Sequence, residues 1–218
     1  MLRTLYLAAA LAVASFSSQA MPLLSGDGSE TCVNGAPLGP GACTVTVIRA
    51  HPAWQPPGAG QWISYTDTGP VGTTLAPPSG TTPVFSVFEA FSVTGPSTLS
   101  LTVWADDTAG ILLNGNLLSP LSGAAPNFTQ GTCASGALGC EPREAGIFNA
   151  ALGVGSHTLE FQVYQVGTTQ TPRSNPFGLL YEGSVDDPGP GPSAVPVPMS
   201  GALAAAAFAG MLMLRRKR

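Results

Sequence analysis

Leu99-Ser-Leu-Thr-Val-Trp-Ala105 is the stretch that decides the fold, because apolar and polar side chains alternate along it. Leu99, Leu101, Val103 and Ala105 share one face, and Ser100, Thr102 and Trp104 share the other. This period of two is typical of a β-strand with one buried face. Thr158 to Val166 repeats the pattern, with Leu159, Phe161 and Val163 on its apolar face. Both stretches therefore predict long strands that cover a core.

Further strands are predicted from other apolar segments. They are Cys43 to Ile48, Gln61 to Tyr65, Val84 to Val93, Gly110 to Leu113 and Phe177 to Gly183. Asn114-Gly115 lies between two apolar pairs, which predicts a two-residue hairpin turn. Between the two ends of the chain no window has a sustained helical period, and 27 Gly and 21 Pro residues indicate many turns. We expect an all-β, two-sheet sandwich over residues 21–186.

The order of several segments resembles a known group of folds. These segments are Trp62-Ile-Ser64, Phe85 to Val93, Leu99 to Asp107, Gly110-Ile-Leu-Leu-Asn-Gly115, Leu152 to Phe161 and Asn175-Pro-Phe-Gly-Leu179. Together they are similar to the galactose-binding-domain-like jelly rolls of exported bacterial proteins, over most of residues 43–185. The resemblance implies a two-sheet jelly roll. It leaves sugar binding and a purely structural role open, because one fold hosts many functions.

The first twenty residues predict a secretory signal peptide. Met1-Leu2-Arg3 gives a positive start, Leu5 to Phe16 is apolar, and Ser18-Gln19-Ala20 provides small residues for cleavage. We therefore expect residues 1–20 to be removed on export.

The C-terminal residues have three parts in a fixed order. A Pro/Gly-rich linker over 187–198 ends in Val195-Pro196-Val197-Pro198, and sixteen uncharged residues (199–214) precede Arg215-Arg216-Lys217-Arg218. As a helix, sixteen residues rise about 24 Å, against about 30 Å for a hydrocarbon core. Residues 199–214 are expected to be a transmembrane helix, and the four cations favour a cytoplasmic end at 215–218.

This tail resembles the PEP-CTERM sorting signal of Gram-negative bacteria. The resemblance implies transient anchoring in the inner membrane, cleavage near Pro196-Val197-Pro198 by a sorting protease of the exosortase type, and delivery to the cell surface or extracellular matrix. Val197 departs from the family, which has Glu at that position, so the identity of the processing enzyme stays open. A permanent membrane anchor is the alternative.

The predicted exported part is strongly acidic. Its cations are Arg49, Arg143 and Arg173, and it holds all twelve Asp and Glu residues, so its formal net charge is −9. Nucleic acid is excluded as a partner, because binding to phosphates requires a basic surface.

Four cysteines lie in the exported part. Cys32 and Cys43 are eleven residues apart, and Cys133 and Cys140 are seven apart. In an oxidising compartment local pairing is the simplest of the three connectivities. A zinc site is the alternative, but Cys-x-x-Cys spacing is missing and the chain has two histidines.

Asp106 and Asp107 form the most specific candidate site, and Asn114 lies at the tip of the hairpin that follows them. Adjacent carboxylates and an amide oxygen suit calcium, which takes six to eight oxygen ligands. They also suit direct hydrogen bonds from sugar hydroxyls, and similar Asp-Asp pairs bind calcium and sugar in some adhesin lectins. Turn formation is the third interpretation, because Asp bonds its own backbone at strand ends.

Aromatic side chains could provide a platform for a sugar ring. Trp54 lies in a proline-rich loop and is the better candidate for exposure, whereas Trp104 lies on a strand whose inner face the sequence does not identify. Core packing is the default expectation for Trp54 and Trp104, and Trp62 is also expected in the core.

Motifs for enzymatic chemistry are absent from the sequence, with no Gly-x-Ser-x-Gly elbow and no phosphate loop. We expect a non-enzymatic surface or matrix protein that binds extracellular polysaccharide. A structural surface protein without a specific ligand and a polysaccharide-active enzyme are the alternatives.

Overall fold

Antiparallel strands make up the regular structure of this chain. The structure, a computed structural model, describes residues 19–78, 81–128, 137–166, 171–187 and 189. Within them every strand pair is antiparallel, and the helical elements are two 3-10 turns, η1 (Ala36–Leu38) and η2 (Pro142–Glu144). No helix in this part of the chain has the length and apolar character needed to cross a membrane.

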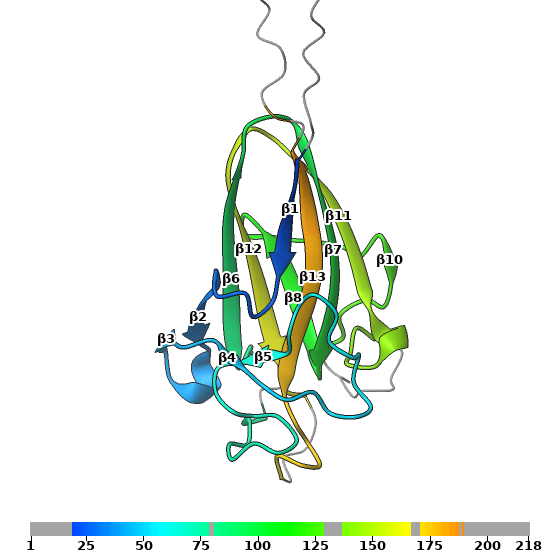
Figure 1. The fold of residues 1–218 in the computed structure, drawn as a ribbon. Helices are drawn as coiled ribbons and strands as arrows, with labels where there is room; N and C mark the ends of the chain where they lie inside the picture. The colour runs from blue at the N-terminus through cyan, green and yellow to red at the C-terminus, as the bar shows by residue number, and fades with distance from the viewer. Residues whose placement is uncertain (1–18, 79–80, 129–136, 167–170, 188, 190–218) are drawn as a thin grey trace, which may run out of the picture.

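The strands form two sheets, which face each other as a two-sheet jelly-roll sandwich (Figure 1). The seven-stranded sheet has the order β10-β11-β7-β13-β5-β4, and β1 also pairs with β13. Its strands are β1 (Gln19–Leu24), β4 (Thr46–Val47), β5 (Ile63–Ser64), β7 (Ser97–Asp106), β10 (Ser122–Gly123), β11 (Gly146–Leu152) and β13 (Gly178–Asp187). The six-stranded sheet has the order β3-β2-β6-β12-β8-β9. Its strands are β2 (Thr31–Asn34), β3 (Gly41–Cys43), β6 (Phe85–Val93), β8 (Thr108–Leu113), β9 (Asn116–Leu117) and β12 (Gly155–Tyr164). The all-β, two-sheet prediction is confirmed.

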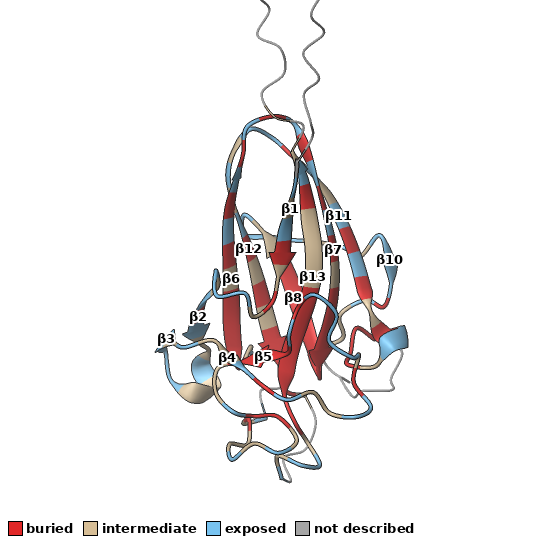
Figure 2. Cartoon of the chain, viewed as in Figure 1, coloured by how far each residue is buried: buried red, intermediate tan, exposed pale blue. Residues whose placement is uncertain are grey.

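The main core lies between the sheets and is built by the alternation seen in the sequence. Leu99, Leu101 and Val103 of β7 face Phe161 and Val163 of β12 across this core, and all are buried. Buried and exposed residues alternate along the long strands (Figure 2). Each large apolar side chain buried here contributes about 1.5–3 kcal/mol to the free energy of unfolding.

A second apolar cluster lies on the outer face of the seven-stranded sheet. The loop between β4 and β5 folds over this face, and the cluster contains Ile48, Trp54, Trp62, Trp104, Cys140 and Leu180. Trp54 and Trp62 pack at a ring-centroid distance of 4.2 Å. The expectation that Trp62 is buried is confirmed.

The hairpin prediction is confirmed in detail. Leu113 pairs with Asn116 across the β8–β9 turn. Asn114 and Gly115 both have positive φ values, +52° and +79°. This conformation is the reason that Asn-Gly suits such turns.

One strand prediction is wrong in extent. The predicted strand Cys43 to Ile48 is divided, because β3 forms an edge of the six-stranded sheet and β4 forms an edge of the other. The chain therefore crosses between the sheets at residues 44–45, which the apolar pattern alone did not indicate.

Cys32 and Cys43 form a disulfide that joins β2 to β3. Cys140 is also disulfide-bonded. Its predicted partner, Cys133, lies outside the described residues, as do residues 1–18 of the predicted leader, the sorting motif Val195 to Pro198, the predicted helix over 199–214 and the basic end 215–218.

The described chain begins and ends at the same end of the sandwich. Gln19 at the start of β1 pairs with Asp187 at the end of β13 (Figure 1). β13 has ten residues, so Gly178 at its other end lies about 30 Å away. The loop before Gly178 and the loops on either side of β5 gather at that opposite end, which we call the loop end.

Candidate functional site

Asp106 and Asp107 are both buried, each 4% exposed. Asp106 ends β7 on its outer face and accepts a hydrogen bond of 2.8 Å from Trp54 Nε1. Asp107 accepts one of 2.7 Å from the backbone N–H of Val166. The structure thus uses both carboxylates in internal hydrogen bonds, so a ligand would have to displace those bonds to reach them.

Burial also changes the acidity of Asp106. Loss of hydration raises the pKa of its carboxyl well above the ordinary value, and the negative charge of Asp107 raises that pKa further. The hydrogen bond from Trp54 acts in the opposite direction. A buried carboxyl of this kind binds a proton more readily than an exposed one.

Trp54 and Trp104 are both buried, which agrees with the default expectation of core packing and not with the hypothesis of an exposed sugar platform. The side chain of Trp54 is 3% exposed and that of Trp104 is 8% exposed, because both lie in the cluster beneath the β4–β5 loop. The proline-rich sequence around Trp54 indicated a loop correctly. It did not indicate that the loop folds back with its indole against the sheet.

Asn114 lies apart from the aspartate pair. Its Oδ1 accepts a hydrogen bond of 3.0 Å from the backbone N–H of Thr158, and its side chain is exposed. β8 separates it from Asp107, so the two residues are about 20 Å apart. A single site made of Asp106, Asp107 and Asn114 is therefore excluded by the fold.

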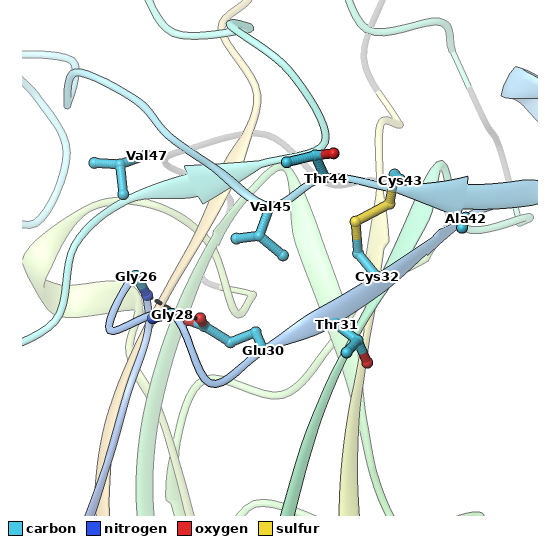
Figure 3. Close-up of a pocket in the computed structure, with 10 residues that line it drawn as sticks. All are labelled: Gly26, Gly28, Glu30, Thr31, Cys32, Ala42, Cys43, Thr44, Val45 and Val47. Carbon is cyan, nitrogen blue, oxygen red and sulfur yellow. Dashed lines mark hydrogen bonds between the residues drawn. A yellow bond between two sulfur atoms is a disulfide. The ribbon is translucent and has the colours of Figure 1, made fainter.

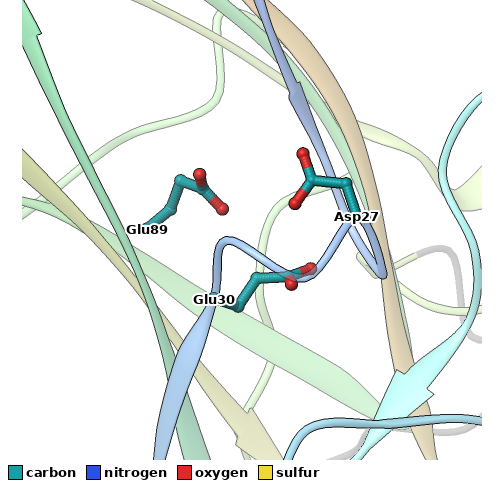
Figure 4. A group of neighbouring side chains, drawn as sticks. All are labelled: Asp27, Glu30 and Glu89. Atoms are coloured by element: carbon teal, nitrogen blue, oxygen red, sulfur yellow. The ribbon is translucent and has the colours of Figure 1, made fainter.

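Three other carboxylates do come together. Asp27 and Glu30 lie in the connection that crosses from β1 to β2, and Glu89 belongs to β6 (Figure 4). One oxygen from each lies within 4.8 Å of the others. We call these residues the acidic cluster.

Hydrogen bonds hold the acidic cluster in place. Ser29 Oγ donates to Asp27 Oδ1 at 2.5 Å and lies 2.7 Å from Glu89 Oε1. Tyr181 Oη donates to Glu89 Oε2 at 2.7 Å. Glu30 accepts from the backbone N–H groups of Gly26 and Gly28. The crossing loop is thus tied to both sheets.

Glu89 is the buried member of the cluster and faces the core with Val87 and Phe91 of the same strand. Burial raises the pKa of its carboxyl, although the hydrogen bonds from Tyr181 and Ser29 lower it; Asp27 and Glu30 raise it as well. The contacts described for this cluster include no cation. Three acids without a counter-charge are the chemistry that suits a divalent cation bound by oxygen.

Sequence reasoning missed this cluster, although one signal for it was present. In Phe85-Ser-Val-Phe-Glu-Ala-Phe-Ser-Val93, Glu89 shares the apolar face with Phe85, Val87, Phe91 and Val93. A carboxylate on the buried face of a strand needs a partner. Asp27 and Glu30 gave no such signal, because only the crossing of the chain between sheets brings them to Glu89.

Two hollows are relevant here, one beside the acidic cluster and one at the loop end. One, of about 460 Å³, adjoins the acidic cluster, with Glu30 on one side and the Cys32–Cys43 disulfide on the other (Figure 3). The second, of about 660 Å³, lies at the loop end and is called the loop-end hollow. It is lined by Arg49, Ala50, His51, Pro52, Pro70, Val71, Gly72, Thr171, Pro172 and Arg173.

Comparisons with known proteins add a set of weak structural likenesses. No protein-family model and no curated protein matches the chain. A family 35 carbohydrate binding module from Clostridium thermocellum is 10% identical over 77% of this chain and 98% of its own, with a TM-score of 0.37. A CBM35 module from Cellvibrio japonicus is 15% identical over 77% of this chain and 92% of its own, with a TM-score of 0.36.

A GH26-CBM35 β-(1,4)-mannanase from Podospora anserina is 12% identical over 84% of this chain, with a TM-score of 0.36, and the match covers 29% of that enzyme. Likenesses at this level carry no argument about the function of the chain.

Proposed function

We propose that this chain is an exported surface or matrix protein that binds extracellular polysaccharide, without hydrolysing it, at its loop end. The observation that carries the proposal is that the two ends of the sandwich differ. Both ends of the described chain lie at one end, and the loop-end hollow lies at the other. A protein held or released through its C-terminal tail would present this hollow away from the membrane.

The lining of the loop-end hollow suits a sugar. Proline and valine side chains offer apolar surface to a ring face, and arginine, histidine and threonine side chains offer hydrogen-bond donors. Its volume of about 660 Å³ is within the usual range of ligand pockets, roughly 300–1,000 Å³. Among the described residues its lining includes no carboxylate, whereas glycoside hydrolysis uses two. These features support binding rather than turnover.

The targeting part of the proposal rests on the sequence. The leader over residues 1–20 and the tail from Val195 to Arg218 support export, sorting by an exosortase-type protease and a place at the surface of a Gram-negative bacterium. The inner membrane is then a transient partner through residues 199–214.

We further propose that the acidic cluster holds calcium in a structural role. Asp27, Glu30 and Glu89 supply carboxylate oxygens close to one another, and calcium prefers such ligands. The ion would neutralise like charges where the β1–β2 crossing meets β6, and would hold that crossing in place.

Binding is tested with the full chain in mild detergent on arrays of neutral and acidic polysaccharides. Val71→Asp places a charge in the loop-end hollow, and Val154→Asp is the matched control, because Val71 and Val154 are similarly exposed, 63% and 67%. We expect Val71→Asp to lose binding and Val154→Asp to retain it. Absence of binding to any glycan would favour the alternative, a structural surface protein.

A further inference from the structure

The positive charge of the predicted exported part is concentrated in one place. Arg49 and Arg173 both line the loop-end hollow, and Arg143 is the third cation of that part. The surrounding protein carries twelve acidic residues. Two of three cations in one hollow of an acidic protein indicate a local preference for negative charge.

The guanidinium groups of Arg49 and Arg173 have N–H donors available for a ligand. Both are exposed, and in the described part of the chain neither guanidinium has an ion pair or a hydrogen bond. Arg143, in contrast, pairs with Glu141 at 3.1 Å. A guanidinium has five N–H donors in a planar fork, which fits the two oxygens of a carboxylate.

His51 adds a donor to the same hollow. The backbone N–H of Ala53 donates to His51 Nδ1 at 3.1 Å. Because Nδ1 accepts this bond, the proton of a neutral imidazole lies on Nε2. The His51 backbone is fixed in turn, since its carbonyl accepts a hydrogen bond of 3.0 Å from the N–H of the buried Trp54.

The loops that carry these side chains are tied together. Thr68 Oγ1 donates to the carbonyl of Phe177 at 2.6 Å, and Phe177 N–H donates to the carbonyl of Thr68 at 3.0 Å. The loop before β13 is thereby joined to the loop after β5. Gly69 lies so close to Arg49 that an added Cβ would be 2.8 Å from the Arg49 carbonyl oxygen. Three loops thus form one wall that needs little reordering to bind, which favours affinity.

The lining also limits the size and charge of the ligand. Pro52, Pro70, Val71 and Pro172 give the hollow an apolar surface beside the arginines. The Asp67 carboxylate lies beside Gly72 of the lining, since a Cβ added at Gly72 would be 2.9 Å from Asp67 Oδ1. A chain of many phosphates would extend beyond the hollow, where the acidic residues of the rest of the protein would repel it. A ring with an apolar face and one carboxylate matches the hollow.

We propose that the loop-end hollow recognises an acidic sugar unit, with Arg49 and Arg173 binding its carboxylate and the proline surface packing against its ring. This inference rests on the proposed polysaccharide binding and names its substrate class as uronate-containing glycans. Arg49, His51 and Arg173 are the residues that determine this specificity.

The test is calorimetry on the full chain in mild detergent, with uronate oligosaccharides and with the same oligosaccharides methyl-esterified. Arg49→Gln and Arg173→Gln should each weaken uronate binding about tenfold or more, because each removes a charge-assisted contact. Arg143→Gln changes the net charge equally and should bind as the unaltered protein does. The methyl ester should bind about tenfold or more weakly.

Three results would overturn the inference. If the esters bind as well as the acids and the arginine variants are unchanged, the protein binds polysaccharide by other means and only the charge recognition fails. If inorganic phosphate displaces the uronate at equal concentration, the hollow is a simple anion site. If neither acidic nor neutral glycans bind, the proposed function itself fails.

Discussion

Trp54 shows how one residue links the loop end to the sheet. Its ring packs on Trp62, and its Nε1 donates to the buried carboxylate of Asp106. The same residue fixes the backbone of His51, which lines the loop-end hollow. Trp54 thus supports the loop from below, and the hypothesis that its ring contacts a ligand is not borne out.

Trp54→Phe should lower the free energy of unfolding by about 1–3 kcal/mol, because it leaves the buried carboxyl group of Asp106 without its indole donor. Trp62→Phe is the matched control, since Trp62 Nε1 donates to a neutral acceptor, the carbonyl of Gln55. Urea unfolding of both variants measures the difference. Equal losses would contradict a special role for the Trp54–Asp106 bond.

Glu89 and Asp106 should make stability depend on pH. Burial raises the pKa of both carboxyls, so the folded chain holds protons at pH values where the unfolded chain has lost them. Stability should therefore increase as pH falls from neutral toward about 4, the ordinary carboxyl value. The pKa of Asp187 is lowered by a hydrogen bond from the Thr94 backbone. The contribution of Asp187 to stability is therefore lost only when the pH falls below the window from neutral to about 4.

Thermal unfolding in chelator between about pH 8 and pH 4.5 measures this dependence. Glu89→Gln and Asp106→Asn should each flatten the curve, because each variant removes one of the shifted groups. A midpoint that falls steadily on acidification across this window would contradict the assignment.

The elements differ in how far the sequence could predict them. β7 and β12 alternate regularly and were predicted, because each has a continuous apolar face. β11 was missed, since its inward positions include the small Ala150 while Ile147 faces outward, which weakens the pattern. β1 was missed because it overlaps the predicted cleavage site and contains Pro22, which an edge strand tolerates.

The candidate sites show the same limit. Asp106-Asp107 attracted attention because the two residues are adjacent in sequence, whereas the acidic cluster joins residues about sixty positions apart. Periodicity reports which face of a strand is buried. It does not report which loop crosses to meet that face.

Calcium should stabilise the protein by holding the β1–β2 crossing in place. A ligand that binds only the folded state at about 100 times its Kd adds about 2.7 kcal/mol. We expect calcium to raise the unfolding midpoint of the full chain. Asp27→Asn and Glu89→Gln should reduce that rise, and Asp67→Asn, an exposed acid outside the cluster, should preserve it. A midpoint indifferent to calcium and chelator would contradict the metal assignment.

The two ends of the sandwich differ in what they carry. The described chain begins and ends at one end of the sandwich, and the three tied loops form the other. If the tail is a sorting signal, protein released from the cell surface should end near Val195 to Pro198. Intact-mass analysis measures that end. Finding Arg218 still attached would favour a permanent anchor.

Hydrogen-exchange mass spectrometry tests the central claim most directly, that the loop end binds polysaccharide. The full chain is compared with and without an excess of an acidic matrix polysaccharide. We predict slower exchange in residues 48–54, 69–73 and 171–175, and unchanged exchange near the chain ends in β1 and the last residues of β13. Protection confined to those chain ends, or no protection anywhere, would contradict the account.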